Sequence, residues 1–175
     1  VTNFNGGSLF AGAGTEIHLP KVTSYSHAGT GRGQHRYLRA TGVGALIDLS
    51  GVTTVTGGTY DNDRIFIEAF NGGTVDLQNV ASIKDRSDGE LGNRSIDVTA
   101  DGVDSQVRLT SLKEYRDYYS FDFGSGRYST VAARNGGEID ASLVDTFQGV
   151  NLELDGTGTL AMGPISSFTQ GRIAL

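Results

Sequence analysis

Four segments of this chain concentrate the side chains that could bind a ligand. They are residues 26–35, 56–64, 84–94 and 116–128. Aromatic rings offer flat apolar faces, and Arg and Asp offer bidentate hydrogen bonds, so their combination suits sugars or anionic polymers. The candidate ligand-binding residues are Tyr60, Asp61, Asp63, Arg64, Asp88, Arg94, Tyr118, Tyr119 and Arg127.

The same side chains have two other interpretations. The Arg and Asp residues could pair with one another and hold long loops in place, which is a structural role. Alternatively, the carboxylates could act as the acid and base of a polysaccharide hydrolase or lyase. No spacing singles out one acid–base pair, so the sequence assigns no catalytic residue.

The sequence gives little indication of a metal or cofactor. His18, His27 and His35 lie close together in the chain and could hold a metal, although isolated surface histidines are the more common case. The segments DNDR (61–64) and DRSDGE (85–90) lack the full calcium-loop pattern. Weak calcium binding by these loops is the only cofactor expectation.

Composition excludes several classes of function. The formal net charge is -6, which argues against binding to nucleic acid phosphates. No apolar run is long enough to insert into a bilayer, so no membrane insertion is expected. The absence of Cys rules out disulfides and thiolate metal sites.

The elements that must position the loops follow from an internal repeat. The phrase h-x-h-x-x-h-x-x-h, where h is apolar, occurs six times, beginning at Ile17, Ile47, Val75, Val107, Ile139 and Leu160. A short alternating strand and a glycine turn precede each copy, as in residues 65–73 and 131–137, and residues 173–175 begin this strand again. The shortest repeat, about 21 residues, predicts three short strands and three corners per turn.

This pattern predicts an all-β fold, a single-domain parallel β-helix (β-solenoid) over residues 1–175 with about six three-strand rungs. Pro20 and Pro164 fall in the predicted corner of the phrase, and the Gly-Gly pairs are expected where φ is positive. A β-sandwich is the alternative, but it would not explain one fixed phrase written six times. The four loop segments all follow the third strand of a rung, so they should stack along one edge.

A second row of residues should point away from the coil. It contains His18, Asp48, Asp76, Arg108, Asp140 and Ala161. Neighbouring acids in this row would repel slightly, and Arg108 between two of them would offset the repulsion. Solvated surface charge is the main interpretation, and a bridging cation is the alternative.

The rung phrase "NGGTVDLQNVASI" and its variants "GALIDLSGVTTV" and "NGGEIDASLVDTF" resemble the repeats of large secreted bacterial exoproteins. These include haemagglutinin-like and autotransporter-like adhesins with right-handed parallel β-helices. The resemblance covers nearly the whole chain and implies a right-handed coil and a secreted or cell-surface setting in bacteria. It carries no catalytic motif over to this sequence.

The functional expectation is a non-catalytic structural or adhesive module that acts in adhesion, matrix or fibre assembly. The alternative is a carbohydrate-active module, either a polysaccharide lyase or hydrolase or a glycan-binding module that uses the loop ridge. The expected partners are a polysaccharide or surface ligand, and adjoining rungs or further copies of the chain stacked end to end. Uncapped solenoid ends expose strand edges, which favours such stacking.

Overall fold

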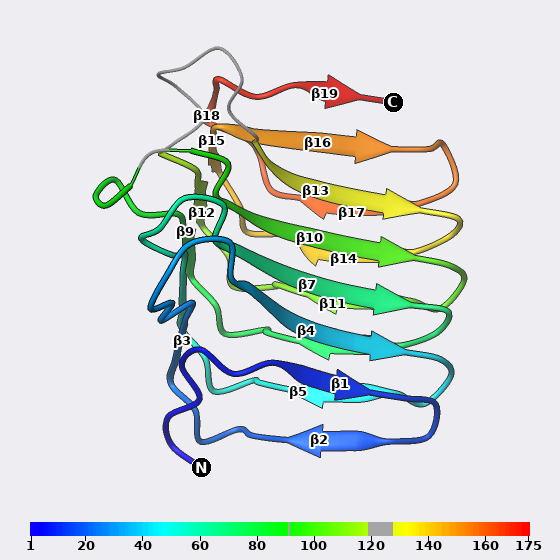
Figure 1. Ribbon diagram of the computed structural model, residues 1–175. Coiled ribbons are helices and arrows are strands. Elements are labelled where there is room, and N and C mark those ends of the chain that lie inside the picture. The colour runs from blue at the N-terminus through cyan, green and yellow to red at the C-terminus, as the bar shows by residue number, and fades with distance from the viewer. Residues whose placement is uncertain (91, 119–127) are drawn as a thin grey trace.

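The computed structural model describes residues 1–90, 92–118 and 128–175. These residues contain strands and turns and no helix, and all strand pairs are parallel. The chain winds through three sheets in turn, so that it forms a β-solenoid with the N- and C-termini at opposite ends of the stack (Figure 1). The expected fold class is therefore confirmed.

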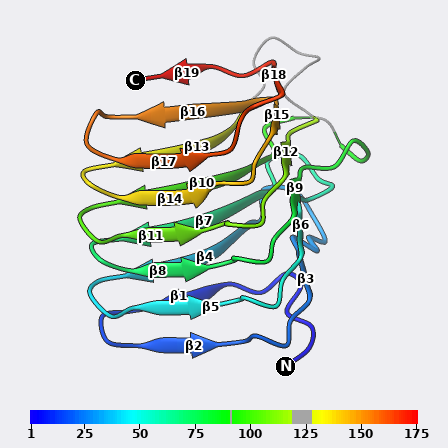
Figure 2. The ribbon, with the colours of Figure 1, turned by 180° about the vertical axis from the view of Figure 1, so that it is seen from behind.

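One strand from each sheet makes up a rung, and the described residues form six rungs followed by β19. Figure 2 shows the second sheet, which lies behind the first in Figure 1. Sheet A contains β1 (Leu9–Ala11), β4 (His35–Thr41), β7 (Arg64–Phe70), β10 (Ser95–Asp101), β13 (Ser129–Arg134), β16 (Val150–Leu154) and β19 (Ile173–Ala174). Sheet B contains β2 (Glu16–His18), β5 (Leu46–Asp48), β8 (Thr74–Asp76), β11 (Gln106–Arg108), β14 (Glu138–Ala141) and β17 (Thr159–Met162). Sheet C contains β3 (Ser24–Ser26), β6 (Thr54–Thr56), β9 (Ser82–Lys84), β12 (Glu114–Arg116), β15 (Thr146–Gln148) and β18 (Ser167–Thr169).

The repeat phrase sets the register of the sheets. Its first apolar positions pair across sheet B, where Val107 lies between Val75 and Ile139. Its last apolar positions pair across sheet C, where Tyr115 lies between Ile83 and Phe147. The six sequence copies thus correspond to the six rungs.

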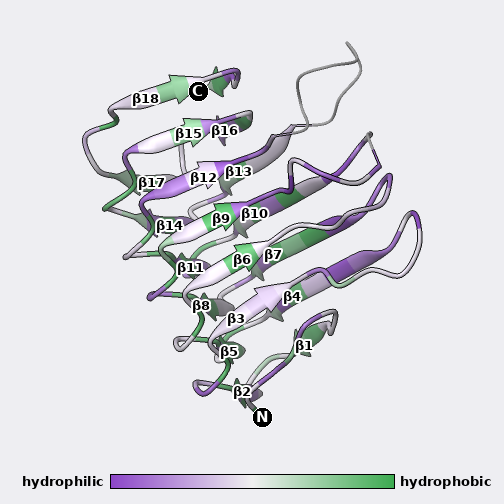
Figure 3. Ribbon diagram, turned by 90° about the vertical axis from the view of Figure 1, so that its left-hand side faces the viewer, coloured by the Kyte–Doolittle hydropathy of each residue, from purple (hydrophilic) through white to green (hydrophobic). Residues whose placement is uncertain are grey.

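The interior of the coil is a column of these inward side chains. Most are aliphatic and have no exposed surface. Figure 3 shows the hydrophobic stretches of the strands in green. The buried rings of Tyr115 and Phe147 pack at 6.3 Å between centroids, and the hydroxyl of Tyr115 donates a hydrogen bond to the carbonyl oxygen of Ile96. A buried hydroxyl needs such a partner, because leaving it unpaired costs free energy.

The h-x-x-h step is a tight turn between sheets B and C. The amide of Val52 donates to the carbonyl oxygen of Leu49, and the corresponding bond recurs in other rungs. The outward Asp before the corner stabilises it, because a carboxylate oxygen of Asp48 accepts a hydrogen bond from the amide of Ser50 at 3.0 Å. Asp76 and Asp140 make the same contact in their own rungs. The outward acidic row is thus part of the turn chemistry.

The segments 26–35, 56–64 and 84–94, as far as they are described, lie on one edge of the coil, between sheets C and A (Figures 1 and 3). Backbone hydrogen bonds join them from rung to rung, for example from the amide of Gly33 to the carbonyl oxygen of Asp61 and from the amide of Asn62 to that of Gly92. Arg32 also reaches Glu90, two loops away, with both guanidinium contacts within 2.9 Å. The predicted stacking is confirmed for the segments 26–35, 56–64 and 84–94 as far as the structure describes them, whereas most of the fourth segment lies outside the described residues. None of the described residues forms a helix with the length and apolar character that crossing a membrane requires.

Candidate ligand-binding site

The loop ridge is defined here as the described residues of the segments 26–35, 56–64, 84–94 and 116–118. Some of the predicted ligand-binding residues are buried within it. Asp63 is 1% exposed, and its carboxylate accepts hydrogen bonds from the amides of Gln34 and Tyr60 at 3.2 and 3.1 Å. Its second partner is the buried His27, whose Nδ1 lies 3.5 Å from Asp63 Oδ2. The Nε2 of His27 donates to the carbonyl oxygen of Gln34 at 2.7 Å, and burial lowers the pKa of the imidazole. Asp63 therefore joins two loops.

Arg94 has no exposed surface and joins its own loop to the loop of the preceding rung. Its guanidinium donates to the carbonyl oxygens of Gly58 and Asp88 at 2.9 and 2.8 Å, and to that of Arg86. Its Nε lies 3.2 Å from a carboxylate oxygen of the buried Asp85. Asp88 is exposed and pairs with Arg86 at 2.6 Å. These contacts support the loop conformation.

The other predicted ridge residues are more accessible. Tyr60, Asp61 and Arg64 are half-buried, and the Nε of Arg64 donates to the carbonyl oxygen of Asn93 at 3.3 Å. Tyr118 is 36% exposed, whereas Tyr119 and Arg127 lie outside the described residues. A ligand-binding role for the ridge stays a prediction, as does weak calcium binding by its loops.

A recess elsewhere, on the outer face of sheet A, brings together side chains that could bind a ligand. It measures about 530 Å³, which is within the usual size of small-ligand pockets. It arises because two successive rungs carry short side chains at an outward position. In one outward row, Arg39 is followed by Glu68, then by the short Thr99 and Ala132, and then by Glu153. Thr99 and Ala132 thus form a floor between two taller walls.

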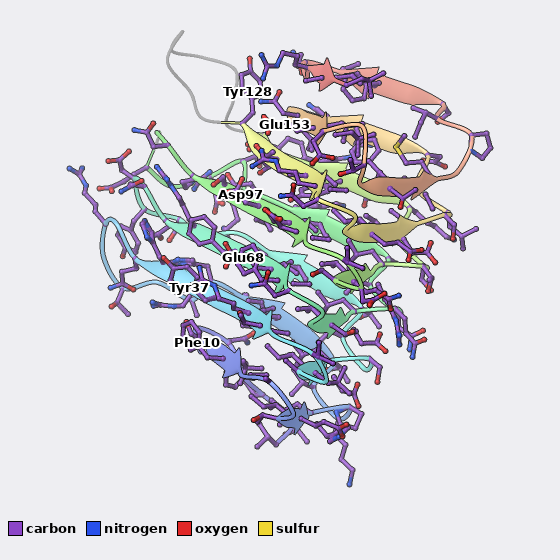
Figure 4. The ribbon with its side chains drawn as sticks, turned by 90° about the vertical axis from the view of Figure 1, so that its right-hand side faces the viewer. Phe10, Tyr37, Glu68, Asp97, Tyr128 and Glu153 are labelled. Atoms are coloured by element: carbon purple, nitrogen blue, oxygen red, sulfur yellow. The ribbon has the colours of Figure 1, made fainter. Side chains whose placement is uncertain are left out.

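Aromatic rings lead up to this recess along the neighbouring outward row. Tyr37 and Phe66 stack with a centroid distance of 5.0 Å and an interplanar angle of 12°, and Phe10 lies 5.8 Å from Tyr37. Tyr37 and Phe66 each cover one face of the other, so that little of the row presents an open ring face. Phe66 is the last ring of the row and also lines the recess, and Tyr128 lines it from the rung beyond. Figure 4 shows Phe10, Tyr37, Glu68 and Asp97 in succession along the stack, with Glu153 and Tyr128 beyond them.

The recess is acidic. Its lining includes the carboxylates of Glu68, Asp97 and Glu153 and the guanidinium of Arg134. Asp97 is 5% exposed and accepts hydrogen bonds from the hydroxyl of Ser95 at 2.9 Å and the amide of Thr130 at 3.0 Å. Such contacts hold each acid as an oriented hydrogen-bond acceptor.

Arginines fix the two outer acids of the recess. Arg39 contacts Glu68 at 2.6 Å, and Arg134 forms an ion pair with Glu153. Arg172 adds a more distant contact to Glu153 at 3.6 Å. With the amide side chain of Asn151 on the same lining, the recess offers several polar groups beside the rings of Phe66 and Tyr128.

Comparisons with known proteins give no indication of function, so the function is inferred from this geometry. No family model, curated protein or solved structure matches this chain. The right-handed sense and the adhesin resemblance therefore rest on the rung phrase alone.

Sequence reasoning did not select the recess. Phe66, Glu68, Asp97 and Thr99 lie in regular strands, whereas the predicted ligand-binding residues lie in the irregular loops. The available signal was the change in side-chain size when outward positions of successive rungs are aligned. Among the residues that the structure describes, no group of three or more His, Asp or Glu side chains is placed to hold a metal ion.

Proposed function

We propose that this chain is a non-catalytic β-solenoid module that binds a glycan on the outer face of sheet A. The observation that carries the proposal is the recess of about 530 Å³, in which Phe66 lies beside fixed polar acceptors. A pyranose ring has an apolar face and a rim of hydroxyl groups, so it matches an aromatic ring surrounded by carboxylate and amide oxygens.

The surface around the recess favours a polymer over a single sugar. The outward rows continue along the stack on both sides, and rungs repeat every 4.8 Å or so, close to the length of one sugar unit. A chain lying along the stack would thus meet a repeating surface while one unit fills the recess. A secreted or cell-surface setting and a role in adhesion belong to the proposal, and the resemblance of the rung phrase to bacterial exoproteins supports them.

The binding test compares two aromatic residues on the same face of sheet A. Phe66 lines the recess, whereas Phe10 is 58% exposed and lies outside its lining. Titration calorimetry against a panel of neutral, basic and acidic oligosaccharides should identify a ligand. Phe66→Ala should weaken its binding about tenfold, which corresponds to about 1.4 kcal/mol, and Phe10→Ala should change it less than about twofold.

Failure of this proposal would be clear from the same titrations. If no oligosaccharide binds, or if both variants lose affinity equally while melting at the wild-type temperature, the recess is not a glycan site. Thermal melting of both variants, followed by circular dichroism, serves as the folding control.

A catalytic role is the second candidate, and one observation favours it. Glu68 and Asp97 stand on adjacent strands at diagonal positions, which places their Cα atoms about 7–8 Å apart. Both side chains also line the recess, and inverting glycosidases use two carboxyl groups about 6.5–9.5 Å apart across the bond that is cleaved. Both acids here already have partners on the protein, which favours binding over proton transfer.

Chain length after incubation separates the two candidates. Polysaccharides incubated overnight with the protein should elute unchanged in size-exclusion chromatography. If the wild-type protein shortens a polymer and Glu68→Gln does not, the protein is an enzyme instead.

A further inference from the structure

The recess is closed at both ends along the stack, and each end wall spans two outward rows. At one end Phe66 and Glu68 stand on the same face of β7, and at the other end Asn151 and Glu153 do so on β16. The floor row between the two walls contains only short side chains. The open space is therefore bounded along the direction in which a straight chain on this face would run.

The wall on β7 is held by contacts within the protein. Tyr37 stacks behind Phe66 with 5.0 Å between ring centroids, and the Nε of Arg39 lies 2.6 Å from a carboxylate oxygen of Glu68. The guanidinium of Arg39 also lies 4.8 Å from the ring centroid of Tyr37. Moving Glu68 aside would separate a partly buried ion pair, which is unfavourable. This wall should therefore stay in place when a ligand arrives.

The wall on β16 is held in a similar way. The side-chain oxygen of Asn151 accepts a hydrogen bond from the amide of Arg172 at 3.1 Å, and Glu153 forms an ion pair with Arg134. A carboxylate that is paired with an arginine can still accept hydrogen bonds from hydroxyl groups, because its two oxygens offer about four acceptor sites. The walls can thus bind sugar hydroxyls while their charges are balanced within the protein, which favours a neutral sugar.

The length of the floor limits what can enter the recess. Three rung steps separate Glu68 from Glu153. At about 4.8 Å per step their Cα atoms lie about 14 Å apart, and the side chains of the walls fill part of this span. The remaining length suits about one or two sugar units of about 5 Å each. A long straight chain at this depth would collide with both walls.

The orientation of Phe66 indicates how a sugar would lie. Tyr37 covers one face of its ring, so the face left for a ligand is the opposite one, which borders the recess. A pyranose that stacks on this face lies parallel to the aromatic ring. Its equatorial links leave within the plane of the sugar ring, so they lead out of the recess and not along its floor.

We propose, building on the glycan-binding function above, that the recess receives a short neutral side branch of a polymer whose main chain passes above the two walls. The branch stacks on Phe66 and lies over Thr99 and Ala132, and its hydroxyl groups bond to the polar groups of the walls. The outward rows on either side of the recess support the main chain. An unbranched chain has only its ends to place in the recess.

The test compares oligosaccharides that share a main chain and differ in branching. Titration calorimetry pairs cellotetraose with the xyloglucan heptasaccharide, mannopentaose with its galactosyl derivative, and xylotetraose with its arabinosyl derivative. In at least one pair we expect the branched member to bind about tenfold more tightly or better. Both members of a pair have the same main-chain ends, so a site for chain ends would bind them equally.

Variants assign the preference to the recess. Thr99→Phe fills the floor, and strands tolerate aromatic residues well. It should weaken binding of the branched member about tenfold and leave that of the linear member within about twofold. Thr54→Phe is the matched control at an exposed position of β6 and should change neither affinity. Thermal melting, followed by circular dichroism, shows whether both variants fold.

A second variant tests the walls if Thr99→Phe fails to fold. Glu153→Ala removes one side of a wall and lets a linear chain enter lengthwise. The difference in affinity between the branched and linear members should then shrink to within about threefold. An unchanged difference would contradict the role of the walls.

Each other outcome contradicts a defined part of the argument. If no pair favours its branched member, while Phe66→Ala still weakens binding, the branch preference is wrong and glycan binding stays. A preference for the branched member that survives in folded Thr99→Phe would mean that the branch binds outside the recess. No binding of any oligosaccharide would overturn both proposals.

Discussion

Asp85 forms an ion pair with Arg94, but its burial opposes the ionisation of its carboxyl group. It is 1% exposed and lies 3.2 Å from the guanidinium of Arg94, but neither of its carboxylate oxygens has a hydrogen-bond donor in good geometry. Burial raises the pKa of Asp85 to about 7, and the attraction to Arg94 only partly opposes this effect. The folded protein therefore keeps a proton on Asp85 at pH values where the unfolded chain has released it.

The free energy of unfolding should therefore depend on pH. Between the unfolded pKa of 3.8 and the folded pKa of about 7, the folded state binds more protons, so its stability falls as pH rises. Asp85→Asn removes this titration. We expect the variant to gain at least about 1.4 kcal/mol relative to wild type between pH 4 and pH 8, the equivalent of one pKa unit. Urea unfolding at both pH values measures this, and a variant that loses stability relative to wild type as pH rises would show that the attraction to Arg94 prevails.

The candidate site could be predicted from the sequence only in part. Alternation in a strand predicts that Phe66 and Thr99 face outward, and the structure agrees. The recess between them appears only when rungs separated by loops of unequal length are aligned. In the loops no periodicity separates inside from outside, and so the sequence does not indicate that Asp63 and Arg94, two of the candidate ligand-binding residues, are buried.

The corners between sheets A and B show how two glycines of one pair serve different purposes. In the NGG turn, Asn71 and Gly72 have φ of 52° and 88°. Positive φ was expected at the Gly-Gly pair, and Asn71 takes one of these positions because Asn tolerates this region. Gly73 is required for another reason, since a Cβ there would lie 2.4 Å from the carbonyl oxygen of Ala40 in the rung below.

This distinction predicts the effect of adding one methyl group. Gly73→Ala should destabilise the protein by about 1–3 kcal/mol, because the neighbouring backbone cannot move without disturbing a rung. Gly12→Ala is the matched control in the corner of the first rung, where a Cβ would meet nothing within 4 Å, and it should be neutral or stabilise by up to about 1 kcal/mol. Differential scanning calorimetry compares the two, and equal melting temperatures would contradict the steric argument.

The strands themselves were the most predictable elements. One apolar phrase specified the pairing of sheets B and C to the residue, because every rung must place the same side chains in the same interior column.

Over the whole molecule, a rung packs mainly against its two neighbours, so stability should vary along the stack. Strands β7 and β10 pair on both sides, whereas β1 pairs only with β4. Leu160 and Phe168, in the last rung, are also only partly buried. We expect amide hydrogen exchange to be slowest in the central rungs and at least about tenfold faster in the outermost ones, which corresponds to about 1.4 kcal/mol. Mass spectrometry of peptic peptides measures this, and uniform protection would indicate that the coil opens as one unit.

Stacking of further rungs or copies on the outer strands stays a prediction. Met162 and Ile173, at one end of the described stack, are 39% and 55% exposed, and such apolar groups beside open strand edges favour association. Sedimentation at increasing concentration distinguishes a self-stacking chain from a monomer.

The two-rung depth of the recess has a consequence for how such a protein can change. Since the floor consists of one short side chain per rung, its length is an integer number of rungs, each adding about 4.8 Å. Duplicating the segment that contains Thr99 or Ala132 would lengthen the cavity by one unit while repeating the same pattern of inward side chains. Duplication or loss of a gene segment that encodes one whole rung would thus change the length of the ligand that fits by one rung at a time. The number of copies of that segment would then set the ligand specificity.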